Sequence, residues 1–189
     1  MASPKEANQN QDKTEDKDKA KRWKVIEKGL PHWQALAETS QEAHYDSARH
    51  YMKKNNWMGV PATIFSAVVG GSVFASLDKG DIAFWMRIVL SVISVTAAML
   101  SALQTFLHYG DLVERHHNAA AGYGAIHVEI ECTKFIPIED RDDPKEVLNG
   151  LKNRMEALEK DSPPFPERIW AKYEGTFESI KKNIASDYY

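Results

Sequence analysis

The sequence predicts an all-α membrane protein, in which an antiparallel two-helix transmembrane hairpin continues into a cytoplasmic helical bundle. Two long apolar stretches, residues 57–77 and 82–107, have the length and composition of membrane helices. Only a few residues separate them, so the two helices must be antiparallel. In the flanking segments apolar or small residues recur every three or four positions, which is typical of packed helices.

Residues 1–22 are predicted to form a disordered polar tail. From Ala2 to Arg22 there is no large apolar residue, and Lys, Asp, Glu, Asn and Gln alternate. Such a segment buries too little surface to offset the entropy lost on ordering. Its polarity also argues against a cleavable signal peptide.

Residues 23–56 are predicted to form a cytoplasmic helical arm that leads into the first span. One face of this arm is small or aromatic for more than five turns, as expected of a packed surface. That face consists of Trp33, Ala37, Ser40, His44, Ser47 and Tyr51.

The two predicted spans differ in polarity. Residues 57–77 carry no charge and form a helix about 31 Å long, close to the hydrocarbon thickness of a bilayer. Residues 82–107 contain one charge, Arg87, placed near the start where it can snorkel to the interface. The alternative, two core helices of a soluble protein, is disfavoured because 189 residues with charged flanks cover two such helices poorly.

Basic residues predict the orientation of the hairpin in a plasma (inner) membrane. Four of them lie close to the ends of the two spans that are remote from the connecting loop, whereas that loop carries Lys79. The positive-inside rule therefore places both termini of this two-pass protein in the cytoplasm. The four basic residues are Arg49, Lys53, Lys54 and Arg115.

Residues 108–189 are predicted to form further cytoplasmic helices. Asp143 or Asp142 is a suitable N-cap for one of them, with Pro144 at the first helical position. The prolines of DSPPFPE separate the last two helices. The predicted packing faces are Leu112, His116, Ala119, Tyr123, Ile126 and Ile130; Leu148, Leu151, Met155 and Leu158; and Trp170, Tyr173, Phe177, Ile180 and Ile184.

Several classes of function have no sequence support. There is no Gly-rich phosphate loop, Cys/His zinc pattern or Ser/His/Asp arrangement, so we expect neither an enzyme nor a cofactor. Acids balance the basic residues, which argues against nucleic-acid binding. Glu114 and His117 have the Glu-x-x-His spacing of carboxylate-bridged metal sites, but the chain contains no second copy to complete a coordination shell.

The second span carries a stripe of small and polar residues at intervals of four and three. One explanation is close helix packing, with the hydroxyls bonded to carbonyls of their own helix. The other is that several copies of the helix line a narrow hydrated pore. The candidate pore-lining residues are Arg87, Ser91, Ser94, Ser101, Thr105 and His108.

This layout resembles that of the SLATT proteins, two-transmembrane effectors associated with SMODS and SLOG domains in bacterial conflict systems. The resemblance covers residues 33–184 and rests on AHYDSARHYMKKNNW, the tight hairpin, HHNAAAGYGAIHVEIE and SPPFPERIWAKY. It implies a pore-forming or membrane-disrupting effector of antiviral defence, which causes growth arrest or death during phage infection (abortive infection). It also implies a nucleotide second messenger or a sensor protein as the trigger.

Two functions therefore remain open, and a third, a membrane-bound metalloenzyme, would need ligands from neighbouring copies to complete a site at Glu114 and His117. The first is a homo-oligomeric pore-forming effector in which the cytoplasmic arms pack together and gate the pore, with His108 and His116 making that packing sensitive to pH. The second is a non-conducting membrane anchor or accessory scaffold subunit that recruits a cytoplasmic partner.

Overall fold

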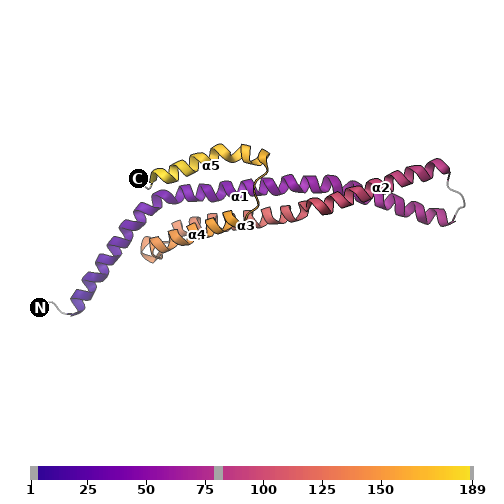
Figure 1. The fold of residues 1–189 in the computed structure, drawn as a ribbon. Helices are drawn as coiled ribbons and strands as arrows, with labels where there is room; N and C mark the ends of the chain where they lie inside the picture. Colours follow the sequence, from indigo (N-terminus) through magenta and orange to yellow (C-terminus); the bar gives the residue numbers. More distant parts are fainter. Residues whose placement is uncertain (1–3, 79–82, 188–189) are drawn as a thin grey trace. The chain divides into compact units, whose positions relative to one another are not determined.

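A computed structural model describes the backbone of residues 4–78 and 83–187, and the side chains of residues 17–72 and 83–186. Every regular element within those ranges is helical, which confirms the predicted all-α class. Of the predicted connection between the spans, residues 78–81, Asp78 lies in the last turn of α1 and residues 79–81 lie outside the described residues. The elements in Figure 1 are α1 (Pro4–Asp78), α2 (Phe84–Leu107), α3 (Tyr109–Phe135), η1 (Ile138–Asp140), α4 (Pro144–Asp161) and α5 (Glu167–Asp187).

The chain divides into two compact units. Unit 1 consists of Met1–Asp46 and His116–Tyr189, and unit 2 consists of Ser47–Arg115. Unit 2 contains both apolar stretches, whereas unit 1 contains the segments predicted to form the helical bundle. Helices α1 and α3 contribute residues to both units because each runs through a boundary between them.

The N-terminal segment differs from the disordered tail that we expected. Helix α1 begins at Pro4, and two of its basic side chains contact the segment before α4. Lys19 donates a hydrogen bond to the carbonyl oxygen of Glu139 (3.4 Å), and Arg22 lies 3.4 Å from a carboxylate oxygen of Asp143. The segment is rich in Lys, Glu, Gln and Ala, which have high helix propensity. The two long-range contacts add to this local preference for helix.

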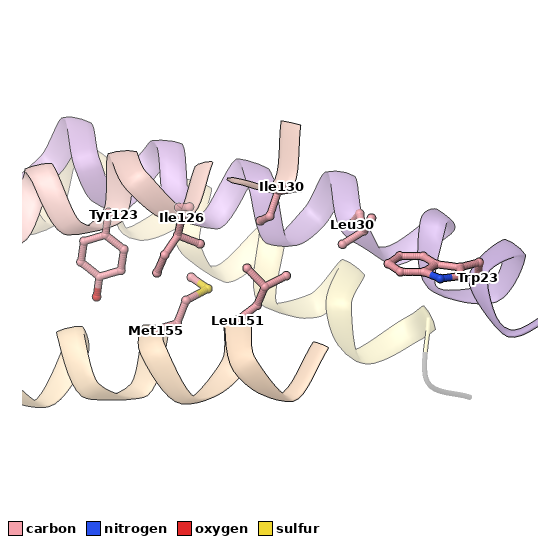
Figure 2. Close-up of a cluster of buried hydrophobic side chains, with 8 residues drawn as sticks. Trp23, Leu30, Tyr123, Ile126, Ile130, Leu151 and Met155 are labelled. Atoms are coloured by element: carbon pink, nitrogen blue, oxygen red, sulfur yellow. The ribbon is translucent and has the colours of Figure 1, made fainter. Parts of the chain in front are cut away.

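The larger core of unit 1 joins α1, α3 and α4. Figure 2 shows Ile126 and Ile130 of α3 directed toward Leu151 and Met155 of α4, with Leu30 of α1 nearby. Burial of each such side chain contributes about 1.5–3 kcal/mol to stability. Within unit 1, the members of the two predicted packing faces from Trp33 to His44 and from His116 to Ile130 are buried or half-buried.

A buried arginine holds the segment between α3 and α4. The guanidinium of Arg141 donates hydrogen bonds to Glu27 (2.6 Å) and to the carbonyl oxygens of Ile136 (2.7 Å) and Lys134 (3.3 Å). It also lies 5.0 Å from the ring centroid of Trp23. The charge is tolerated because it is paired and hydrogen-bonded as it leaves water.

The predicted ends of the last two helices are confirmed. Asp143 is the N-cap of α4, where its carboxylate accepts a hydrogen bond from the backbone N–H of Lys145 (2.9 Å), and Pro144 occupies the first turn. The prolines of the joint fall between α4 and α5. Helix α5 then packs beside α1 through a second buried cluster of Ala43, Ile169, Tyr173 and Phe177 (Figure 1).

Candidate functional site: the apolar helix of unit 2 and the histidine pair of unit 1

One face of α2 is packed within unit 2. The amide of Gln104 donates a hydrogen bond to Asn55 of α1 (3.1 Å). A Cβ added to Gly59 would lie 2.9 Å from Nε2 of Gln104, so glycine leaves the space that the glutamine occupies. The buried or half-buried residues of α2 recur at intervals of three and four, and they are Leu90, Ile93, Ala97, Leu100, Gln104 and Leu107.

The rest of α2 exposes large apolar side chains. Phe84 and Phe106 are each 79% exposed, and Trp85 and Met99 are each 62% exposed. Soluble proteins rarely leave so much apolar surface in contact with water. Within the described residues, one continuous but bent helical stretch, Phe84–Phe135, is long and apolar enough to cross a membrane.

The six predicted pore-lining residues are all exposed. They lie beside the packed face of α2 and do not form part of it, so the packing made by the described residues does not bury the stripe. Two hydroxyls of the stripe are hydrogen-bonded within α2. Ser91 donates to the carbonyl oxygen of Arg87 (2.8 Å), and Thr105 donates to that of Ser101 (3.0 Å).

His108 marks the end of α2 through its backbone. Its φ of 47° and ψ of 34° are left-handed, and His is one of the residues that adopts this conformation more readily than most. The ring Nδ1 lies 2.8 Å from the carbonyl oxygen of Phe106, which has lost its helical partner at the break. The left-handed backbone of His108 lies at the break between α2 and α3, while its side chain is exposed.

The first predicted span forms the end of α1, and the side chains of residues 73–77 lie outside the described residues. Thr63 donates to the carbonyl oxygen of Gly59 (2.9 Å), and Ser66 donates to that of Ala62 (2.8 Å). A Cβ at Gly70 or Gly71 would meet no described atom within 4 Å. Within the described part of the chain, no second helix therefore approaches closely at this glycine pair.

Two buried histidines meet in unit 1. Nδ1 of His44 on α1 lies 2.9 Å from Nδ1 of His116 on α3, and the side chains are 2% and 0% exposed. A hydrogen bond between two such nitrogens requires one protonated and one unprotonated Nδ1. His44 also stacks on Tyr123, with ring centroids 5.6 Å apart and planes 15° apart, and packs on Phe165 at 4.5 Å.

The surroundings of His44 favour its uncharged ring. Burial, followed by repulsion from His116, lowers the pKa of His44 to about 4. Burial, followed by the nearby Glu159 carboxylate, raises the pKa of Tyr123 to about 12. At neutral pH, His44 and Tyr123 are therefore both neutral.

Sequence reasoning missed the contact between the two histidines. It placed His44 and His116 on two separate packing faces. Their pairing depends on the register between α1 and α3, which no local spacing reveals. The Glu114 and His117 side chains are exposed, and no group of three or more His, Cys, Asp or Glu within residues 17–72 and 83–186 is arranged to hold a metal ion.

Comparison with protein-family models, with curated proteins and with solved structures gives no match to this chain. The resemblance to the SLATT proteins therefore remains a prediction.

Proposed function

We propose that this protein is a membrane effector that forms a homo-oligomeric pore, with the polar stripe of α2 lining a hydrated path. One observation carries the proposal: α2 uses one face for packing within the chain and leaves two other faces exposed, one apolar and one polar. Lipid matches the apolar face, whereas water or neighbouring copies match the polar face better than lipid does.

The proposed membrane part is an antiparallel hairpin of residues 57–77 and 82–107. Its support is the packing of α2 on α1 within unit 2 and the exposed apolar surface of α2. A cluster at one end also suits a membrane interface: the ring centroids of Tyr51 and Tyr109 are 5.7 Å apart, and Nζ of Lys54 lies 5.8 and 5.6 Å from them. Aromatic rings and snorkelling lysines are typical of that depth.

The distribution of basic residues supports a plasma-membrane location with both termini in the cytoplasm. In this arrangement unit 1 lies in the cytoplasm. Because α1 and α3 run through both units, a change in the packing of unit 1 has a continuous helical connection to the spans. We propose that such a change gates the pore.

The proposed biological role follows the SLATT resemblance. The trigger is a nucleotide second messenger or a sensor protein, and opening leads to growth arrest or cell death in a bacterial anti-phage system. Inducible expression with a dye that reports membrane potential tests this role, since a pore depolarises the cells. Retained potential together with normal growth, both at high expression and during phage infection, would contradict it.

Ion selectivity tests the pore itself. In planar bilayers containing purified protein, Ser94→Asp is expected to raise the permeability ratio of cations to anions, and Ser94→Lys to lower it, because a fixed charge concentrates counter-ions. Ser94→Asn is the matched uncharged control. Equal selectivity in all three variants would remove Ser94 from the pore wall.

A second candidate is a non-conducting anchor that recruits a cytoplasmic partner. It is favoured by the hydroxyls of Ser91 and Thr105, which bond to carbonyl oxygens of their own helix and so need no water. An anchor leaves membrane potential unchanged at every expression level, which separates it from the effector.

A further inference from the structure

Unit 1 contains a cleft of about 660 Å³ between α1, α3, α4 and α5. This volume falls within the range of about 300–1,000 Å³ that is usual for small-molecule sites. The cleft includes the joint between α4 and α5, where prolines restrict the backbone. Five aromatic side chains contribute to its walls: Trp33, Tyr123, Phe165, Trp170 and Phe177.

Several of these rings lie nearly parallel to one another. Phe165 and Trp170 have centroids 6.4 Å apart and planes 20° apart, and for Trp170 and Phe177 the values are 5.9 Å and 15°. Parallel rings offer their faces to a flat aromatic compound, which gains both buried area and stacking. Because the prolines hold Phe165 in a rigid segment, little order has to be created on binding.

Polar groups are few and neutral on the inner side of the cleft. His44 lines it with an uncharged ring whose Nδ1 is engaged by His116. Ser162 also lines it, and its Oγ is buried with no hydrogen-bond partner among the described residues. Rotation about its Cα–Cβ bond lets this hydroxyl donate to an acceptor in the cleft.

The charged residues of the cleft do not favour an ionic ligand. Lys152 is paired with Glu156 at 3.6 Å, and these side chains are 57% and 62% exposed. Lys181 and Glu159 add one charge of each sign. The cleft therefore offers no excess of either charge to bind a phosphate or a carboxylate.

We propose that this cleft binds a small, flat, uncharged aromatic heterocycle, stacked between the aromatic walls and accepting a hydrogen bond from Ser162. The site is independent of pore formation, since binding is measured without any conductance. It adds a ligand-binding activity to unit 1 whether the chain conducts ions or anchors a partner.

Quinoline and naphthalene are suitable probes because they share a shape and differ by one ring nitrogen. The full-length protein, labelled with fluorotryptophan and held in detergent micelles, gives fluorine NMR signals for its five tryptophans. Saturable shifts are expected at Trp33 and Trp170, which line the cleft. Trp23, Trp57 and Trp85 lie elsewhere and report non-specific partition into the micelle.

Quinoline is expected to bind about threefold to tenfold more tightly than naphthalene, the usual effect of one hydrogen bond. Ser162→Ala should abolish this preference and leave the affinity for naphthalene unchanged. Ser186→Ala is the matched control, because its hydroxyl lies on the exposed end of α5 and bonds to the carbonyl oxygen of Asn183. A preference that survives Ser162→Ala would overturn the assignment of this hydroxyl.

The aromatic wall is tested at Trp170, which is 41% exposed and therefore tolerates truncation. Trp170→Ala should weaken both probes about fivefold or more, whereas Trp170→Phe retains a ring and most of the affinity. Phe135→Ala, at a residue that is 81% exposed and outside the cleft, should have no effect. The proposal is overturned if Trp33 shows no saturable shift, or if Trp57 and Trp85 shift in parallel with it.

Discussion

The histidine pair makes the stability of unit 1 depend on pH. In the unfolded chain His44 titrates near its ordinary pKa of about 6.5, whereas in the folded chain its pKa is about 4. Between these values the unfolded chain takes up a proton that the folded chain refuses, so the free energy of unfolding falls as the pH falls. Stabilisation is complete above about pH 6.5 and is lost progressively down to about pH 4.

The magnitude follows from the gap between the two pKa values. At about pH 5 the solution is about 1.5 pH units below the pKa of the unfolded imidazole. Each unit of this gap stabilises the protonated unfolded chain by about 1.36 kcal/mol. We therefore expect the free energy of unfolding to be about 2 kcal/mol lower at about pH 5 than at about pH 8. Urea titrations followed by tryptophan fluorescence measure this difference, since Trp23, Trp33 and Trp170 all lie in unit 1.

A matched pair of substitutions isolates the contribution of His44. His44→Asn keeps a polar group near the position of Nδ1 but removes the titration, so it should remove about 2 kcal/mol of the pH dependence. His117→Asn changes an exposed histidine and should leave the dependence intact. If both variants keep the full dependence on pH, burial of His44 is not its source and the reasoning fails.

Three further predictions concern single contacts, each measured by urea or thermal unfolding. Arg141→Ala should cost about 1.5–3 kcal/mol because it removes the charged hydrogen bonds to Glu27 and to two carbonyl oxygens; Arg154→Ala, at an exposed pair, should cost less than about 1 kcal/mol. Asp143→Ala should cost about 1 kcal/mol by removing the N-cap of α4, and a loss below about 0.3 kcal/mol would contradict that role. Gly59→Ala should displace the Gln104 side chain, break its hydrogen bond to Asn55 and so cost about 1 kcal/mol of stability. In a Gln104→Ala background, where that hydrogen bond is already absent, Gly59→Ala should cost nothing further.

Local patterns in the sequence predicted much of the helical architecture. Spacing at three and four identified the buried faces around Ser40 and Tyr123, and the Asp-Pro pair located the start of α4. These features depend on interactions within a turn or along one helix face, which a sequence displays directly.

Features that depend on contacts between distant segments were not predictable in this way. The N-terminal helix is stabilised by contacts of Lys19 and Arg22 with residues 139–143. The burial of Arg141 depends on its ion pair with Glu27 and its contact with the Trp23 ring. The His44–His116 contact and the aromatic cleft likewise depend on helix register.

For the polar stripe of α2, the spacing predicted which residues share a helix face but not which face packs within the chain. Its spacing correctly indicated that these residues share one face of a helix. Only the structure shows that a different face, which includes Ala97 and Gln104, is used for packing within the chain.

A cysteine-accessibility scan of α2 tests the central claim most directly. Single cysteines are placed in liposome-reconstituted protein in which Cys132, the one native cysteine, is replaced by serine, and their reaction with a membrane-impermeant thiol reagent is measured. We predict rapid reaction at stripe positions such as Ser94 and Ser101, and protection at the apolar positions Val95 and Met99. Equal protection of both faces, or reactivity without helical periodicity, would contradict a water-filled path along the stripe.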